Sequence, residues 1–267
     1  MSSASSYKGN IPQNYEQYLG PILFEPFAQD LAARVPTYCR SVLELACGTG
    51  RVTSHLDKKL NAATRLVASD LNTDMLQLAR TVSYSPRVEW MEIDAQRLPF
   101  ADAVFDLVVC QFGVMFFPDK MSAFSEVHRV LEKGGSFLFN TWDGYSVNPR
   151  AALIMQVMQE ELGERAPDFL SVGPYSFHNE ATIAHFLEEA GFSSIRFEKA
   201  SFTTTFQSPS ELVDGFVDGS PLGSYLDKID VTMRDRIKQR LYSAIDRQSA
   251  TYGNSVPMQA IVVEAVR

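Results

Sequence analysis

The chain has 267 residues, 45% of them hydrophobic, and a formal net charge of −8. A chain of this length can bury one sizeable core. Nucleic-acid partners are disfavoured, because phosphate backbones bind basic surfaces and the longest basic cluster is Lys58-Lys59. No apolar run reaches the roughly 18 residues of a membrane span, and "MSSASSYKGN" lacks a signal-peptide core. We therefore expect a cytoplasmic protein.

The cysteines are Cys39, Cys47 and Cys110, an odd number without a C-x-x-C pair. This usage is typical of reduced thiols and argues against both a disulfide framework and a zinc site. We therefore expect no bound metal.

The first half of the chain alternates strand-like and helix-like segments. A helix is predicted over residues 50–60, and Asn72 is placed to cap a second helix that carries Met75. "DKMSAFSEVHRVLEKGG" predicts a third helix that ends at its glycines. The apolar runs between these helices predict strands in "SVLELA", "RLVASD", "RVEWMEID", "AVFDLVVCQFG" and "SFLFNTW". This alternation predicts an α/β fold with a doubly wound, mostly parallel sheet.

The second half is less regular. Asn148-Pro149 favours the start of a helix that ends near Gly163. "TIAHFLEEAGF" predicts another helix, Ser208 and Glu211 are spaced as a capping box, and a polar helix is expected around 231–249. Two strands, near 194–206 and 256–266, are predicted to complete the sheet.

A glycine-containing stretch, "VLELACGTGRVT", follows the first predicted strand. Ligands of doubly wound sheets bind beyond the carboxyl ends of the strands, where Gly48 and Gly50 allow close backbone approach. The dinucleotide fingerprint G-x-G-x-x-G is incomplete, because Thr53 occupies the third glycine position. The loop therefore favours a nucleotide-like ligand other than a nicotinamide dinucleotide.

Acidic residues end the next two predicted strands. Asp70 stands 20 positions after Gly50, where a carboxylate accepts hydrogen bonds from ribose hydroxyls. Asp94 ends the third strand, where a carboxylate can accept from the amine of adenine. Three neighbouring strand ends therefore predict one adenosine site.

Four stretches together resemble the motifs of class I S-adenosylmethionine-dependent methyltransferases, in the small-molecule branch of the ubiquinone/menaquinone-biosynthesis enzymes. They are "VLELACGTG", "ASDLNTDML", "IDAQRLPFADAVFDLVVCQFGVMFF" and "VHRVLEKGGSFLFNTW". The resemblance is dense over residues 10–142. It implies a seven-stranded Rossmann-like fold and an enzyme that uses S-adenosyl-L-methionine and releases S-adenosyl-L-homocysteine.

The resemblance also implies a division of the chain and a set of cofactor-binding residues. The expected division is a single domain over 1–267, with a helical segment over 1–40 closing over the cofactor, a cofactor-binding core over 41–142, cap insertions over 144–176 and 207–250, and sheet completion over 177–206 and 251–267. The implied cofactor residues are Tyr15, Tyr18, Glu44, Ala46, Gly48, Gly50, Asp70, Asn72, Met75, Asp94, Ala95, Gln111 and Phe112.

The acceptor is left open by the sequence. The [N/D]-P-P-[Y/F] signature of nucleic-acid base methylation is missing after the fourth strand, which favours a small-molecule acceptor. His178, before a predicted helix, is a candidate general base. The rival hypotheses are a nicotinamide-dependent oxidoreductase and a catalytically idle cofactor-binding module that works through a protein partner. We expect a monomer or a homodimer.

Overall fold

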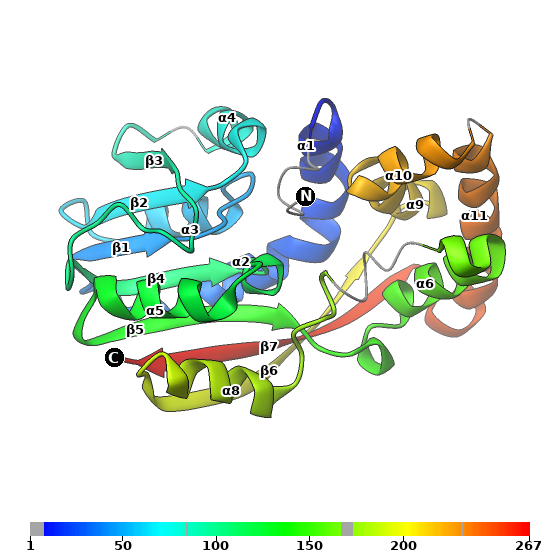
Figure 1. Cartoon of the computed structure of the whole chain (residues 1–267). Helices are drawn as coiled ribbons and strands as arrows, with labels where there is room; N and C mark the ends of the chain where they lie inside the picture. Colours follow the sequence, from blue (N-terminus) through cyan, green and yellow to red (C-terminus); the bar gives the residue numbers. More distant parts are fainter. Residues whose placement is uncertain (1–7, 84, 167–172, 231) are drawn as a thin grey trace.

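The structure, a computed structural model, describes residues 8–83, 85–166, 173–230 and 232–267. The described residues form a seven-stranded sheet in the order β3-β2-β1-β4-β5-β7-β6 (Figure 1). Its strands are β1 (Ser41–Glu44), β2 (Arg65–Asp70), β3 (Val88–Glu92), β4 (Phe105–Gln111), β5 (Leu131–Trp142), β6 (Ser193–Thr205) and β7 (Ser255–Val266). The sheet confirms the predicted doubly wound α/β class.

Strands β1 to β5 pair in parallel, and β7 runs antiparallel to both of its neighbours, β5 and β6. The strand order reverses at β1, because β2 and β4 flank it on opposite sides. A crevice forms beyond the carboxyl ends of the strands at such a reversal. The glycine loop follows β1 and therefore lies where a ligand is expected.

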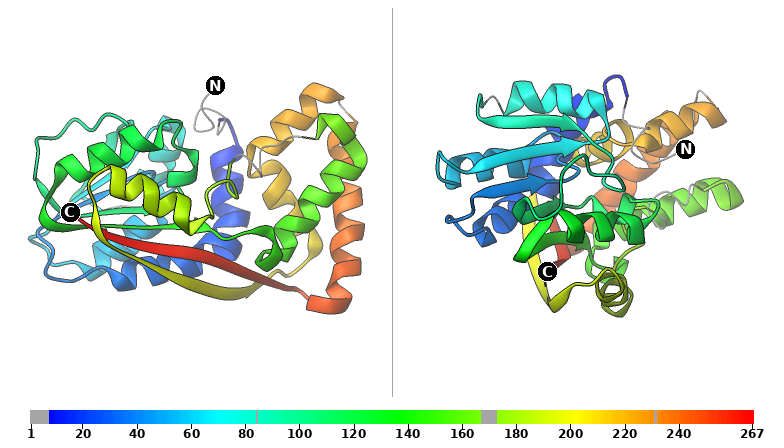
Figure 2. Two further views of the ribbon diagram at one scale, coloured as in Figure 1. Left: turned by 60° about the horizontal axis from the view of Figure 1, so that its bottom comes forward. Right: turned by 60° about the vertical axis from the view of Figure 1, so that its left-hand side comes forward.

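Helices cover both faces of the sheet. On one face lie α2 (Glu25–Arg34), α3 (Arg51–Lys59) and α4 (Thr73–Val82), and on the other α5 (Lys120–Val130) and α8 (Glu180–Glu189) (Figures 1 and 2). Phe27, Phe105, Phe124, Phe137 and Phe139 are fully buried between these layers. Such rings bury large apolar areas and dominate core energetics.

A second group of helices lies beyond the carboxyl ends of β4 and β5 (Figure 1). It consists of α6 (Pro149–Leu162), α9 (Pro209–Asp218), α10 (Pro221–Ile229) and α11 (Met233–Tyr252). The helices α1 (Ile11–Asn14) and η2 (Tyr15–Phe24) pack between this group and the sheet. We call the four helices the cap. The predicted boundaries of the insertions remain predictions, and residues 1–7, 167–172 and 231 lie outside the described residues.

Element η2 is a ten-residue π-helix rather than an α-helix. Its wider turn is visible where Glu25 N–H donates to the carbonyl oxygen of Gly20, five residues earlier. Helices of this kind are rare and concentrate at functional sites. The described residues also form short 3-10 turns at η3 (Val114–Phe116), η4 (Tyr145–Val147) and η5 (Gly163–Arg165).

Three local predictions need correction. The helix α5 ends at Val130 rather than at the glycines, because Leu131 pairs with Phe105 of β4 and strand β5 begins there. The capping box does not form: Ser208 makes no cap bond, and Glu211 accepts instead from the Gln207 amide at 2.7 Å. Helix α10 was not predicted at all.

Candidate functional site

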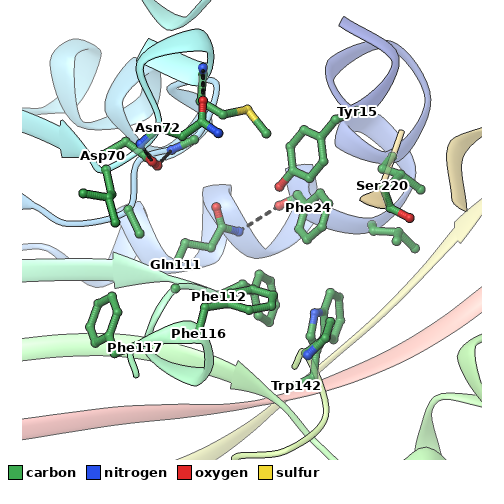
Figure 3. Close-up of a pocket in the computed structure, with 18 of the residues that line it drawn as sticks. Tyr15, Phe24, Asp70, Asn72, Gln111, Phe112, Phe116, Phe117, Trp142 and Ser220 are labelled. Carbon is green, nitrogen blue, oxygen red and sulfur yellow. Dashed lines mark hydrogen bonds between the residues drawn. The ribbon is translucent and has the colours of Figure 1, made fainter. Parts of the chain in front are cut away.

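One cavity opens beyond the carboxyl ends of β1, β2, β4 and β5 (Figure 3). Two groups of residues line it. The first comes from the strand ends and consists of Leu45, Ala46, Gly48, Asp70, Leu71, Asn72, Met75, Ile93, Asp94, Ala95, Gln96, Gln111, Phe112 and Gly113. We call this group the strand-end side.

The glycine loop has the backbone of a ligand-binding turn. Ala46 has φ 52° and Gly48 has φ 56°, both in the left-handed region. For an alanine this conformation is strained, and such strain gathers at binding sites. The Cys47 amide donates to the carbonyl oxygen of Ser69 at 2.9 Å, which ties the loop to the end of β2. The loop is thus held open toward the cavity.

Asp70 fixes the same loop from the side. One carboxylate oxygen accepts from the Gly48 amide at 2.8 Å, and the other accepts from the Asn72 amide at 2.8 Å. Burial raises the pKa of Asp70, and the backbone donors oppose that rise. A carboxylate has about four lone-pair sites, so acceptor capacity remains for the hydroxyls of a ribose.

Asp94 presents a second carboxylate to the cavity. It accepts from the Gln96 amide at 2.9 Å and from the Gln96 side chain at 3.0 Å. Asn72 caps α4 as predicted, accepting from the amides of Asp74 and Met75. Asp70 and Asp94 are the only charged side chains among the described residues that line the cavity. The site therefore has a negative charge and no lining cation.

The second group of lining residues is apolar and aromatic, apart from Ser220. It consists of Tyr15, Leu19, Leu23, Phe24, Phe116, Phe117, Pro118, Trp142, Ile154, Met155, Met158, Pro174, Tyr175, Phe216, Ser220 and Leu222. We call it the cap side. These residues come from η2, from η3 and the two residues after it, from the end of β5, from the cap and from the loop before α8.

Stacked rings build the cap side and join it to Phe112 of the strand-end side. Phe112 and Trp142 stack with centroids 4.0 Å apart and planes 11° apart, and Tyr15 stacks on Phe24 at 4.9 Å. Phe112 has φ 48°, a strained conformation that its amide supports by donating to the Asn140 side chain at 3.0 Å. Gln111 donates to the carbonyl oxygen of Phe24 at 3.0 Å (Figure 3). That bond joins the strand-end side to η2.

A polar cluster joins the glycine loop to the N-terminal helices. Thr49 donates to one Glu16 oxygen at 2.5 Å, and Arg51 donates to the other at 2.6 Å. Arg51 also donates to Glu25 at 2.9 Å, which in turn contacts His55 at 2.8 Å. We call these five residues the clasp. The clasp holds Glu16, and with it the neighbouring Tyr15, in a fixed position relative to the loop.

Ten predicted site residues line the cavity: Tyr15, Ala46, Gly48, Asp70, Asn72, Met75, Asp94, Ala95, Gln111 and Phe112. Tyr18, Glu44, Gly50 and His178 are not among the described lining residues. Tyr18 packs beside Gly215 of α9, and Gly50, at φ 82°, has no room for a side chain between Ser83 and Trp90. His178 is exposed, with Nδ1 2.7 Å from the Tyr175 carbonyl oxygen, so the structure does not place it as a base.

Glu44 lies behind the loop rather than in the cavity. It is 1% exposed, and Thr53 donates to its carboxylate at 2.6 Å. Burial raises the pKa of Glu44 to about 8. Thr53, which excluded a dinucleotide fingerprint, thus has a role of its own as the partner of this acid. The geometry agrees with an orienting role for Glu44 and gives it no direct contact with the cavity.

The cysteines are all free and buried. Cys47 lies inside the glycine loop and is 8% exposed, while Cys110 is fully buried in β4 beneath it. Burial raises the pKa of both thiols well above the usual range. No three His, Cys, Asp or Glu side chains gather as a metal ion would need, within the residues described. No described helix combines the length and apolarity needed to cross a membrane.

Sequence reasoning missed most of the cap side. Trp142 ends β5, beside β4, so the rule that found Asp70 and Asp94 would also have found it. Met155 and Met158, both on α6, also line the cavity. Tyr175 and Phe216 carry no local signal, because the packing of distant segments brings them to the site.

Comparisons with known proteins agree with this geometry. Residues 43–139 match the family model described as a methyltransferase domain. A phosphoethanolamine N-methyltransferase of Haemonchus contortus, solved with S-adenosylhomocysteine, superposes with a TM-score of 0.60 at 17% identity, covering 96% of this chain and 56% of that one. At that identity the likeness shows the fold.

Two curated relatives are closer in sequence. A demethylmenaquinone methyltransferase of Lactiplantibacillus plantarum is 32% identical over 178 residues, covering 60% of this chain and 73% of the relative. A ubiquinone/menaquinone biosynthesis C-methyltransferase of Klebsiella pneumoniae is 27% identical over 169 residues, covering 58% and 67%. The chain therefore belongs to the class I S-adenosylmethionine-dependent methyltransferases.

Proposed function

We propose that this enzyme methylates a small-molecule acceptor that binds on the cap side of the cavity, and that it releases S-adenosylhomocysteine. The observation that carries the proposal is the continuity of the cavity. A single space joins the carboxylates of Asp70 and Asp94 to the rings of Phe112 and Trp142. A donor bound at one end and an acceptor bound at the other would share that space.

The strand-end side has hydrogen-bonding groups that fit S-adenosylmethionine. Asp70 retains acceptor capacity for ribose hydroxyls, Asp94 for the adenine amine, and Gly48 leaves its backbone open to a close ligand. When bound, the cofactor supplies a methyl group activated by a sulfonium cation. Two carboxylates, the face of Tyr15 and the absence of a described lining cation all favour positive charge in this cavity.

The protein contributes by holding the acceptor in position and by excluding water from it. Methyl transfer needs the acceptor atom in line with the bond that breaks, and fixed proximity of this kind supplies roughly 7–11 kcal/mol. Rings from Tyr15, Phe24, Phe112 and Trp142 surround the point where the two sides of the cavity meet. Their apolar faces exclude water from a position that the Gln111–Phe24 hydrogen bond helps to close.

The lining predicts the character of the acceptor. Stacked rings and methionines suit a planar, apolar body, and the two carboxylates disfavour an anionic group. No His or Lys is among the described residues that line the cavity, so we expect an acceptor whose nucleophilic atom is intrinsically reactive. A reduced quinone ring, of the kind named for the plantarum relative, has this character.

The experiment has two steps. Calorimetry with S-adenosylhomocysteine and with NADH should show binding of the first alone. Radiolabelled methyl transfer should then be measured to neutral dihydroxynaphthalenes, with their carboxylated analogues as matched poor acceptors. Tight NADH binding without S-adenosylhomocysteine binding would contradict the assignment. Binding of the homocysteine product without transfer to any of a broad set of acceptors would favour the idle module.

A further inference from the structure

The cap side offers few polar groups to an acceptor. The Ser220 hydroxyl is already engaged, because it donates to the Phe216 carbonyl oxygen at 2.5 Å and accepts from the Leu222 amide at 3.2 Å. The Gln111 amide nitrogen is engaged with Phe24. An acceptor that carries an oxygen or nitrogen would thus lose its hydrogen bonds to water without finding replacements at these groups.

Tyr175 differs from these groups. The residue lines the cavity and is only 8% exposed, yet its hydroxyl forms no hydrogen bond with a residue that the structure describes. Its ring is held in place, stacked on Tyr145 with centroids 4.5 Å apart and on Trp142 at 6.1 Å. A phenol that is mostly buried and has no hydrogen-bond partner among the described residues is unfavourable unless a ligand or water satisfies it. The cavity is the space from which a partner can come.

We propose that the Tyr175 hydroxyl hydrogen bonds to an oxygen or nitrogen of the acceptor, and so selects hydroxyl- or carbonyl-bearing ring compounds over hydrocarbons of the same shape. The proposal rests on the proposed function and names a specificity-determining residue for it. The hydrogen bond would also fix the rotation of a planar acceptor, which stacking between rings leaves free. Orientation then decides which acceptor atom faces the methyl group.

The electrostatics of the site make Tyr175 a neutral hydrogen-bonding group rather than a base. Burial raises the pKa of its hydroxyl far above the usual range, and the neighbouring Tyr145 adds to the rise. A neutral phenol both donates and accepts, so it can bind either a carbonyl or a hydroxyl.

Tyr145 provides a matched control. Its hydroxyl is buried and has no hydrogen-bond partner among the described residues, and its ring stacks on Tyr175, but Tyr145 is not among the described residues that line the cavity. Tyr145→Phe and Tyr175→Phe therefore delete the same atom from adjacent rings. Only Tyr175→Phe should change the affinity for a ligand in the cavity.

The test uses the full chain saturated with S-adenosylhomocysteine and two probes of similar shape, 2-naphthol and 2-methylnaphthalene. Equilibrium dialysis measures both affinities in the wild type and in each variant. Tyr175→Phe should weaken 2-naphthol about fivefold and leave 2-methylnaphthalene unchanged or tighter, as expected for one neutral hydrogen bond. Tyr145→Phe should change neither.

The proposal is overturned if Tyr175→Phe alters both probes equally or alters neither, or if the wild-type complex fails to bind 2-naphthol. The affinity for S-adenosylhomocysteine is measured on the same samples. A wild type that does not bind S-adenosylhomocysteine would count against the proposed function itself. Normal product binding without discrimination between the probes would count only against the role of Tyr175.

Discussion

The two sides of the cavity are built in opposite ways. The strand-end side uses short segments that follow parallel strands, and hydrogen bonds from backbone amides, such as that from Gly48 to the Asp70 carboxylate, fix it in place. The cap side uses η2, η3, β5, α6, α9 and α10, and holds its shape mainly by packing rings such as Tyr15 on Phe24. One side is specified by local chain geometry, and the other by how distant segments meet. The first suits a constant cofactor, and the second suits an acceptor that differs between enzymes.

The largest expected effect comes from removing Asp70. Asp70→Ala should weaken S-adenosylhomocysteine binding by about 3 kcal/mol, because it deletes the proposed ribose acceptor and also the support of the Gly48 and Asn72 amides. Calorimetry measures the change, with the exposed Asp74→Ala as control. An unchanged affinity would mean that the strand-end side does not hold the cofactor.

Glu44, behind the strand-end side, should make the stability of the protein depend on pH. Its pKa is raised in the folded state from 4.5 to about 8, so folding favours the protonated acid. Stability from this group is full below about pH 4.5 and is lost as the pH rises toward 8. Glu44→Gln, which stays neutral, should therefore be more stable than the wild type at pH 8, by on the order of 3 kcal/mol, and nearly equal at low pH. Urea unfolding of both proteins between low pH and pH 8 measures this difference. The same pH dependence of the unfolding free energy in both would contradict the prediction.

Loss of the clasp should disturb both sides of the cavity at once. Arg51→Ala leaves Glu16 and Glu25 without their cation, and we expect a loss of about 2 kcal/mol in unfolding free energy. Because the clasp joins the glycine loop to η2, the affinities for product and for acceptor should both fall. The exposed pair of Arg65 and Glu89 supplies the control, since Arg65→Ala should cost less than about 1 kcal/mol. A loss confined to one side would show that the clasp does not couple them.

The smallest effect isolates the cap side. Met155→Ala removes a half-buried side chain from the cavity wall, and should raise the acceptor KM several-fold, about 1 kcal/mol, from lost apolar contact. Product affinity should stay within about twofold of the wild type. Gln156→Ala, the exposed neighbour on α6, is the control. Equal losses for cofactor and acceptor would mean that the two sides are not separable.

The same contrast explains what the sequence could predict. Asp70 and Asp94 were found because strand patterns are local and the carboxyl ends of parallel strands share one edge. The strand assignments are confirmed, and β2 coincides with "RLVASD". Fold class and cofactor follow from such local patterns. The π-helical form of η2 and the short helix α10 were missed, because packing rather than periodicity selects them.

The cap side was out of reach for a physical reason. Tyr175 lies in the loop before α8, and Phe216 reaches the cavity only because α9 packs on η2. Neither contact has a spacing that could be read along the chain. Glu44 was predicted as a cofactor-site residue from its position in a motif, and the structure places it behind the loop, where Thr53 donates to its carboxylate.

The thiol of Cys47 has a practical consequence. A buried, protonated thiol reacts with disulfide reagents only while its surroundings are open, since the thiolate is the nucleophile. Cys47 sits in the glycine loop, so we expect the rate at which a disulfide reagent modifies it to report any opening of that loop. S-adenosylhomocysteine should lower the modification rate of Cys47, and Arg51→Ala should raise it. The reactivity of a native thiol would thus measure how often the glycine loop opens at the cofactor end of the cavity.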